Sequence, residues 1–154
     1  MEQAGIEMGD TVEDLELPDE TGQPRKLSDF LAMGPVVLFF YPAALTLGCT
    51  KESCHFRDMG EEFALAGAQR VGISSDPVEK QKQFSDKHSF DYPLLADVDG
   101  RIAEQFGVRR SGGRAKRATF VIGQDGRVLD VIRSELRMNV HADRALAALQ
   151  SSAR

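Results

Sequence analysis

Two cysteines, the only ones in the chain, lie five residues apart at positions 49 and 54. Cys49 follows a loop that begins at Pro42 and contains Gly48, and it precedes a segment with helical spacing. Backbone N–H groups and the helix dipole favour an anion at such a junction. Cys49 is therefore the residue best placed to exist as a thiolate, the nucleophilic and redox-active form of cysteine.

Three chemistries suit this pair of cysteines. Zinc binding is disfavoured, because zinc sites usually show paired short ligand spacings and only His55, His88 and His141 could complete a tetrahedron. Two ordinary buried thiols are a common arrangement, but this fits poorly with Cys49, which follows a glycine at a loop-to-helix junction. The third chemistry is a nucleophile with a resolving partner, and we expect neither a metal nor an organic cofactor.

The cysteine segment is preceded by the apolar run Val36–Phe40, which has the length and composition of a strand buried on both faces. Tyr41 is expected to join Phe39 and Phe40 in the core. After Cys49, apolar residues recur at helical spacing and predict one long amphipathic helix that ends near Gly67; they are Phe56, Met59, Phe63 and Ala66. A strand, a loop and a helix thus place the thiol.

The segments before this strand predict a cover for the sheet edge. Leu15 and Leu17 alternate with polar residues, a turn signal occupies 19–22, and residues 25–27 complete a short β-hairpin. Ser28 and Asp29 are expected to cap a short helical turn that carries Phe30 and Leu31. Gly34-Pro35 then breaks the chain before the buried strand.

The segments after it alternate between strands and helices. Strands are expected at 71–73 and 94–96, with Ser75 or Asp76 capping a helix in which Pro77 is the first residue and which ends near Lys87. A short helix at 102–106 and a basic, solvated loop at 109–116 follow. The last elements are a hairpin of strands 118–122 and 128–132 and an amphipathic helix that carries Ala142, Ala145, Leu146 and Leu149.

This order of elements predicts an α/β fold with a thioredoxin-like, central mixed β-sheet flanked by helices and an N-terminal β-hairpin. At 154 residues the chain fits a single domain over 1–154. The longest apolar run is too short to span a bilayer, and the acidic start Met1–Asp10 lacks the features of a signal peptide, so we expect a cytoplasmic protein. A net charge of −5 disfavours nucleic acid and anionic membranes as partners.

Three motifs carry a resemblance to a known family. Pro42, Thr46 and Cys49 fit the Pro-x-x-x-Thr-x-x-Cys signature of the peroxiredoxins. Residues 48–58 read Gly-Cys-Thr-x-Glu-x-Cys-x-x-Arg-Asp, which resembles the bacterioferritin comigratory protein (peroxiredoxin Q) branch, and Arg117 opens a later Arg-x-Thr-Phe. The resemblance covers nearly the whole chain. It implies a thioredoxin fold and a thiol peroxidase that reduces hydrogen peroxide and organic hydroperoxides with thioredoxin or a similar dithiol as reductant.

The resemblance also implies roles for particular residues. Cys49 becomes the peroxidatic cysteine and Cys54 the resolving one, joined as an intramolecular disulfide during turnover, while Thr46 and Arg117 bind the peroxide. These roles agree with physical chemistry, because negative charge builds on the departing oxygen and donors must be aimed there beforehand. Judged without the resemblance, Thr46 would support a turn and Arg117 would be a surface cation.

Two supporting residues and one difference from the sequence pattern of the branch complete the prediction. Pro42 shields the thiolate or simply ends the strand. Glu52 reaches back to the backbone as a cap, bridges Arg117, or stays a solvated helix residue. Leu47 stands where the branch commonly has proline, so the loop is expected to be less preorganised.

Two other functions and the oligomeric state stay open at this point. A general disulfide oxidoreductase is disfavoured because the chain has no Cys-x-x-Cys. A peroxide-responsive redox sensor or holdase-type binding protein could use the same cysteine switch. We expect a monomer or a weak homodimer.

Overall fold

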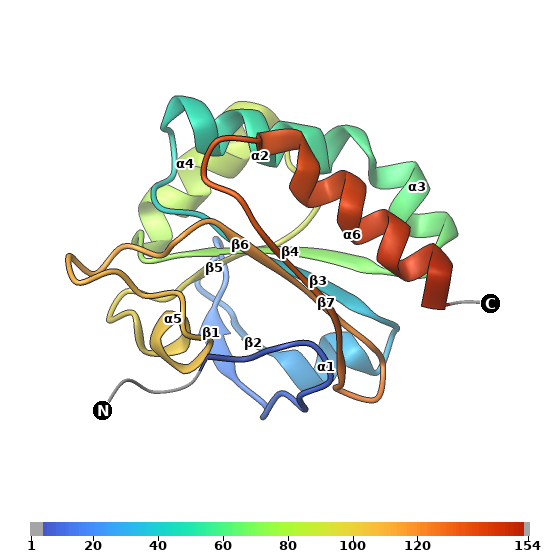
Figure 1. Cartoon of the computed structure of the whole chain (residues 1–154). Coiled ribbons are helices and arrows are strands. Elements are labelled where there is room, and N and C mark those ends of the chain that lie inside the picture. Colours follow the sequence, from blue (N-terminus) through green and yellow to red (C-terminus); the bar gives the residue numbers. More distant parts are fainter. Residues whose placement is uncertain (1–4, 153–154) are drawn as a thin grey trace.

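The computed structural model describes residues 5–152, so the first four residues of the Met1–Asp10 stretch lie outside it. A five-stranded mixed sheet lies at the centre, in the order β5-β4-β3-β6-β7 (Figure 1). Strands β3, β4 and β5 are parallel, whereas β6 is antiparallel to β3 and β7 to β6. The five strands are β3 (Val36–Phe40), β4 (Gln69–Ser74), β5 (Leu94–Ala96), β6 (Ala118–Ile122) and β7 (Val128–Arg133).

Strand β3 is the centre of the sheet and is buried at every residue, as its apolar run predicted. Alternate side chains of a strand point to opposite faces. Leu38 and Phe40 accordingly pack in one hydrophobic cluster, and Val37, Phe39 and Tyr41 in another on the opposite face. The sheet therefore separates two cores, which explains why β3 shows no polar alternation.

Helices cover both faces of the sheet. One face carries α2 (Leu47–Asp58), α3 (Gly60–Leu65), α4 (Val78–His88) and α6 (Met138–Ser152), which lie above the strands in Figure 1. The other face carries α1 (Leu27–Leu31) and α5 (Arg101–Gln105). Within residues 5–152, no helix is long and apolar enough to cross a membrane.

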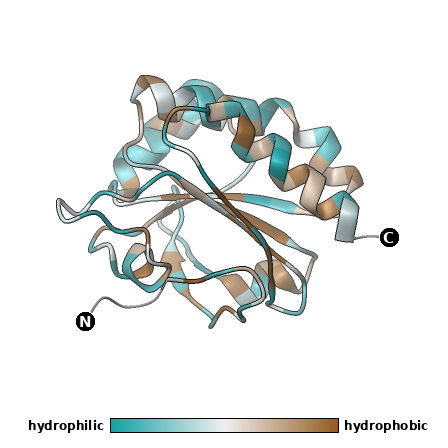
Figure 2. Cartoon of the chain, viewed as in Figure 1, coloured by the Kyte–Doolittle hydropathy of each residue, from teal (hydrophilic) through white to brown (hydrophobic). Residues whose placement is uncertain are grey.

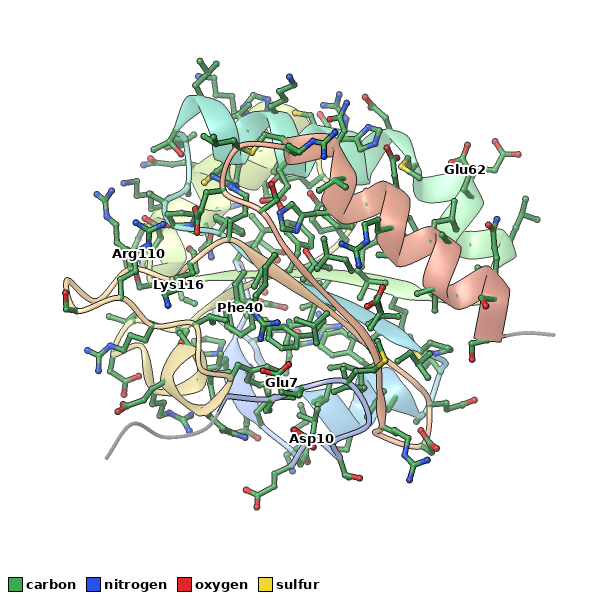
Figure 3. All side chains as sticks on the ribbon, viewed as in Figure 1. Glu7, Asp10, Phe40, Glu62, Arg110 and Lys116 are labelled. Carbon is green, nitrogen blue, oxygen red and sulfur yellow. The ribbon has the colours of Figure 1, made fainter. Side chains whose placement is uncertain are left out.

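Hydrophobic residues concentrate on the strands, and hydrophilic residues are frequent along the helices that cover the sheet (Figure 2). In α6 the buried apolar residues are Ala142, Ala145 and Leu149, three of the four that the sequence predicted, and Leu146 is partly buried. The side chain of Phe40 lies in the interior, whereas Glu62 on α3 points outward (Figure 3).

The N-terminal hairpin is confirmed as a separate two-stranded sheet of β1 (Glu16–Pro18) and β2 (Pro24–Lys26). Its turn is held by Asp19, whose carboxylate accepts hydrogen bonds from the backbone and hydroxyl of Thr21 and from Arg25. The backbone N–H of Leu94 on the edge strand β5 donates to Glu20 at 3.0 Å. The hairpin thus covers the sheet edge, as expected.

The long helix predicted from Cys49 to near Gly67 is wrong, because it is divided into α2 and α3 at Met59. Met59 leaves the helical conformation (φ −95°, ψ 18°), and Gly60 follows it. A Cβ on Gly60 would lie only 3.1 Å from a guanidinium nitrogen of Arg70. That guanidinium donates to the carbonyl oxygen of Phe56 at 2.9 Å, so Arg70 takes up a carbonyl at the end of α2 and Gly60 leaves room for it.

Both predicted helix caps are also wrong. The N-cap of α1 is Lys26, because the Ser28 hydroxyl instead donates to Asp14 at 2.8 Å. The N-cap of α4 is Pro77 itself, with an extended ψ of 165°. The carboxylate of Asp76 instead accepts the backbone N–H of Ala44 at 2.6 Å, and Ser75 does not cap the helix. At both sites a hydrogen bond to a residue distant in sequence has replaced the expected capping bond to the nearby helix backbone.

The basic loop at 109–116 is largely solvent-exposed, as expected, and carries Arg110 and Lys116 away from the sheet (Figure 3). Its ends are tied together by a backbone bridge between Arg109 and Ala115. Arg110 pairs with Glu135 at 2.9 Å, which connects the loop to the segment before α6.

Candidate functional site

Cys49 lies in the first turn of α2, directly after the loop that leaves the carboxyl end of β3. Its side chain is 1% exposed and belongs to the core cluster that contains Tyr41 and Ala44. The helix begins at Leu47 with Thr46 as N-cap, so the thiol sits at the positive end of the helix dipole. The predicted placement of Cys49 is confirmed.

Arg117 is brought to Cys49 by strand pairing. Phe40 at the end of β3 faces Ala118 at the start of β6, so the residue before β6 lies where the cysteine loop begins. The Nη2 atom of Arg117 donates to Sγ of Cys49 at 3.3 Å, and the Arg117 side chain is 6% exposed. The interpretation of Arg117 as a surface cation is therefore wrong.

Glu52 is completely buried on the next turn of α2, and its Oε1 accepts a hydrogen bond from Nη1 of Arg117 at 2.6 Å. The solvated alternative is wrong, and the bridge to Arg117 is the alternative that the structure shows. Burial raises the pKa of Glu52 to about 8, although the nearby Arg117 charge acts in the opposite direction. The guanidinium thus contacts two groups that can both become anions.

The loop from Pro42 to Thr46 connects the end of β3 to the start of α2, where Cys49 lies. Thr46 is exposed and its hydroxyl donates to the carbonyl of Ala43 at 2.7 Å, so in this structure it supports the turn. Leu45 has a positive φ of 66°, which is uncommon for a residue with a side chain. Pro42 is half-buried directly after Tyr41. The backbone N–H of Ala44 in this loop donates to the carboxylate of Asp76, which lies two residues after the end of β4.

Cys54 lies five residues further along α2, half-buried, and both cysteines are free thiols. Burial raises the pKa of the Cys54 thiol. In helical geometry a five-residue separation places the two Cα atoms about 8 to 9 Å apart. A disulfide tolerates roughly 7 Å, so the two cysteines cannot be bonded while α2 is intact.

Two further residues, Glu135 and His141, belong to the site but were not predicted as part of it. Glu135 accepts the backbone N–H of Arg117 at 2.9 Å. His141 on α6 is completely buried and its Nδ1 lies 3.6 Å from Oε2 of Glu52. His141 is a polar residue on the otherwise apolar face of α6, and this position is the signal that could have identified it.

A buried thiol beside a guanidinium, at the start of a helix that follows the central strand of a mixed α/β sheet, defines a peroxiredoxin-type thiol site. A model of the AhpC/TSA family matches residues 8–131. The chain belongs to this family.

Similarity to individual proteins extends over nearly the whole chain. The chain is 60% identical to the peroxidoxin BcpB of Mycobacterium tuberculosis, whose crystal structure matches with a TM-score of 0.91 over 95% of this chain and 97% of that one. It is 38% identical over 152 residues to the peroxiredoxin Bcp of Bacillus subtilis, covering 94% of this chain and 96% of the relative. A structure of the bacterioferritin comigratory protein of Xanthomonas campestris is 33% identical, with a TM-score of 0.82 over 91% and 92%.

These similarities confirm the predicted family, its peroxiredoxin Q branch and the thioredoxin-like fold. The chain is a peroxiredoxin, and peroxiredoxins are thiol peroxidases.

Proposed function

We propose that Cys49 is the peroxidatic cysteine of this thiol peroxidase. The observation that supports this role is the 3.3 Å contact between Sγ of Cys49 and Nη2 of Arg117 in a buried site at a helix start. A guanidinium and a helix N-terminus both favour the thiolate. Cys54, whose thiol pKa is raised, is the less reactive of the two.

In the first step the Cys49 thiolate attacks one oxygen of the peroxide and the O–O bond breaks. Cys49 becomes a sulfenic acid, and the departing oxygen leaves as an alkoxide or hydroxide that takes up a proton to give an alcohol or water. Arg117, the backbone N–H of Cys49 and the Thr46 hydroxyl are the donors for the developing charge. Thr46 turns from the Ala43 carbonyl to do so, and Pro42 shields the thiolate.

In the second step the Cys54 sulfur attacks the sulfenic sulfur of Cys49, which forms an intramolecular disulfide and releases water. Because an intact α2 holds the two residues too far apart, the start of the helix unwinds before this step. Thioredoxin or a similar dithiol protein then reduces the disulfide and becomes oxidised in turn.

The substrate is hydrogen peroxide or an organic hydroperoxide. The bacterioferritin comigratory protein of Xanthomonas campestris is described as having alkyl peroxide reduction activity, which supports an organic substrate here. We further propose that residues 1–154 form one domain that acts in the cytoplasm as a monomer or weak homodimer, without nucleic acid or membrane as partner. The net charge of −5 supports the last point.

Mass spectrometry tests the reaction directly. After one equivalent of peroxide, the mass of the reduced protein should fall by two hydrogens, and digestion should yield one peptide pair linked through Cys49 and Cys54. An unchanged mass, or a linkage only between two chains, would contradict the cycle.

Turnover distinguishes the enzyme from the two alternatives. With a thioredoxin system, catalytic amounts of the protein should consume many equivalents of peroxide. A redox sensor or holdase would stop after about one equivalent, and a general oxidoreductase would reduce insulin disulfides without peroxide. Neither behaviour is expected.

A further inference from the structure

The side chain of Arg117 is shared between two acidic groups. Nη2 donates to Sγ of Cys49 at 3.3 Å, and Nη1 donates to Oε1 of Glu52 at 2.6 Å. All three side chains are less than a tenth exposed. One buried cation cannot fully compensate two buried anions, so a thiolate at Cys49 is favoured when Glu52 holds a proton.

The geometry places that proton on the second oxygen of Glu52. Oε1 accepts from the guanidinium, whereas Oε2 is buried and has no hydrogen-bond partner within residues 5–152. The imidazole nitrogen Nδ1 of His141 lies 3.6 Å from Oε2. This separation is longer than a hydrogen bond but needs only a small rearrangement to become one.

Hydrogen bonds fix the tautomer of His141. Nε2 lies 2.8 Å from the backbone carbonyl of Ser134, which can only accept, so Nε2 carries the hydrogen. In a neutral imidazole Nδ1 is then an acceptor, and the Thr119 hydroxyl donates to it at 2.8 Å. A protonated Glu52 can use the same acceptor once the Thr119 hydroxyl turns its hydrogen away.

We propose that His141 is a positioning residue that accepts a hydrogen bond from protonated Glu52 and thereby keeps Glu52 neutral while Cys49 is a thiolate. The full charge of Arg117 is then available to the thiolate and to the departing oxygen. This inference rests on the proposed role of Cys49. His141 would act on the thiolate only through Glu52 and Arg117.

The surrounding charges are consistent with a neutral His141 and a protonated Glu52. Burial lowers the pKa of His141, and it raises the pKa of Glu52 to about 8. Four ionisable groups face this pair: Arg117 from the residue before β6, Glu135 from the segment before α6, Arg144 from α6 and Tyr92 from the segment before β5. Arg117 and Arg144 disfavour an imidazolium, whereas Glu135 favours a proton on either group.

Two substitutions separate the contact with Glu52 from the contact with Ser134. In His141→Asn the amide oxygen can occupy the position of Nδ1 and keep the acceptor. In His141→Gln the amide nitrogen can occupy the position of Nε2 and keep the bond to Ser134, but the acceptor is lost. The pKa of Glu52, measured by NMR of the ¹³C-labelled carboxyl group, should fall by about one unit in His141→Gln, the effect of one lost hydrogen bond. It should stay near that of the wild type in His141→Asn.

The same variants should differ in the pH dependence of peroxide reduction. In His141→Gln the midpoint of the alkaline limb of the pH–rate profile should shift to a pH about one unit lower, so that the rate constant at pH 8 falls roughly fivefold. His141→Asn should keep the wild-type profile. The proposal would be overturned if the pKa of Glu52 were equal in all three proteins. It would also be overturned if the Glu52 pKa and the rate constant at pH 8 fell equally in both variants, or fell only in His141→Asn.

A measurement on the wild type applies even where a variant does not fold. The ¹⁵N chemical shifts of His141 at pH 7 should report a neutral ring with hydrogen on Nε2. An imidazolium, or hydrogen on Nδ1 alone, would overturn the proposal. The NMR readouts do not depend on turnover, so an absence of peroxidase activity would reject the proposed function while the Glu52 titration still decides the role of His141.

Discussion

Arg117 and Cys49 are 68 residues apart in sequence, yet the guanidinium Nη2 lies 3.3 Å from the thiol Sγ in a buried site. This contact depends on the antiparallel pairing of β3 with β6, which delivers Arg117 to the point where the chain leaves the central strand. A fixed positive charge at this position can stabilise both the thiolate and the charge that develops on the departing oxygen.

Arg117→Met should therefore slow peroxide reduction by roughly 10²-fold or more, the scale of losing one preorganised donor. Stopped-flow kinetics of sulfenic acid formation measure this step, and ultraviolet absorbance of the thiolate measures how much of Cys49 is ionised. Reduction of the disulfide should change less. Arg117→Lys is the matched control, and its rate of peroxide reduction should lie between those of the wild type and Arg117→Met. Lysine keeps the positive charge but lacks the two guanidinium nitrogens that contact Cys49 and Glu52 together. Wild-type kinetics in Arg117→Met would contradict the assignment.

The two cysteines should behave differently when each is replaced. Cys49→Ser should abolish peroxide reduction. Cys54→Ser should consume about one equivalent of peroxide and stop as the sulfenic acid, because the internal disulfide cannot form. Trapping with dimedone followed by mass spectrometry identifies the product. If the first step were lost in Cys54→Ser and kept in Cys49→Ser, the two roles would be reversed.

Disulfide formation should open α2. Amide exchange from Thr50 to about Phe56 should lose protection on oxidation, whereas the strand Val36–Phe40 should keep it. An oxidised protein with the internal disulfide and an intact helix over these residues is the result that would refute the mechanism.

A hydrogen bond to α2 should control how easily this opening occurs. The Tyr92 hydroxyl donates to the carbonyl of Ser53 at 2.7 Å, so Tyr92→Phe should make opening more frequent and leave less Cys49 to be over-oxidised to sulfinic acid. Tyr41→Phe is the control, because the Tyr41 hydroxyl bonds Gln81 on α4 instead. Equal exchange at 50–56 in both variants would exclude this role of Tyr92.

Glu52 should make stability depend on pH. Its pKa rises from 4.5 to about 8 on folding, so the folded state binds the proton more tightly than the unfolded state. The stabilisation from this group is complete below about pH 4.5 and is lost as the pH rises through about 8. Glu52→Gln cannot lose a proton, so its free energy of unfolding, measured in urea, should rise relative to that of the wild type over this range. If the free energies of unfolding of the two proteins ran parallel across this pH range, the raised pKa of Glu52 would be contradicted.

Leu47→Pro should stabilise the reduced protein. Leu47 is the first residue of α2 and is 89% exposed, and Thr46 before it has the extended conformation (φ −88°, ψ 157°) that a following proline requires. The expected gain is about 0.4–1 kcal/mol in the free energy of unfolding, and slower opening should increase the sulfinic acid formed under excess peroxide. Thermal unfolding and mass spectrometry check the two effects, and a loss of stability would indicate strain at residue 47.

Much of the fold was predictable because local patterns and tertiary structure agree. The apolar run of β3, the strands of the β6–β7 hairpin and the apolar face of α6 all lie where the sequence placed them. The predictions failed where a distant side chain took over a local role. The Arg70 side chain hydrogen-bonds a backbone carbonyl at the end of α2, next to Gly60. The Asp76 carboxylate accepts the backbone N–H of Ala44 in the cysteine loop instead of capping α4.

The candidate site was only partly predictable for a similar reason. Motifs identified Cys49, Glu52 and Arg117, and the structure brings these three together. Helical spacing could have placed His141 on the buried face of α6, but not beside Glu52, and nothing in the sequence indicated that Glu135 bonds the backbone of Arg117. Both contacts depend on how the start of α6 packs against β6 and α2.

The pairing of β3 with β6 also has a consequence during protein synthesis. A ribosome adds about 5–20 residues per second, so Cys49 is made roughly 3 to 14 seconds before Arg117, which follows 68 residues later. During that interval the nascent chain carries the thiol without the guanidinium that would stabilise negative charge on the departing oxygen. Translation order therefore delays assembly of the Cys49–Arg117 site until β6 has been made and has paired with β3.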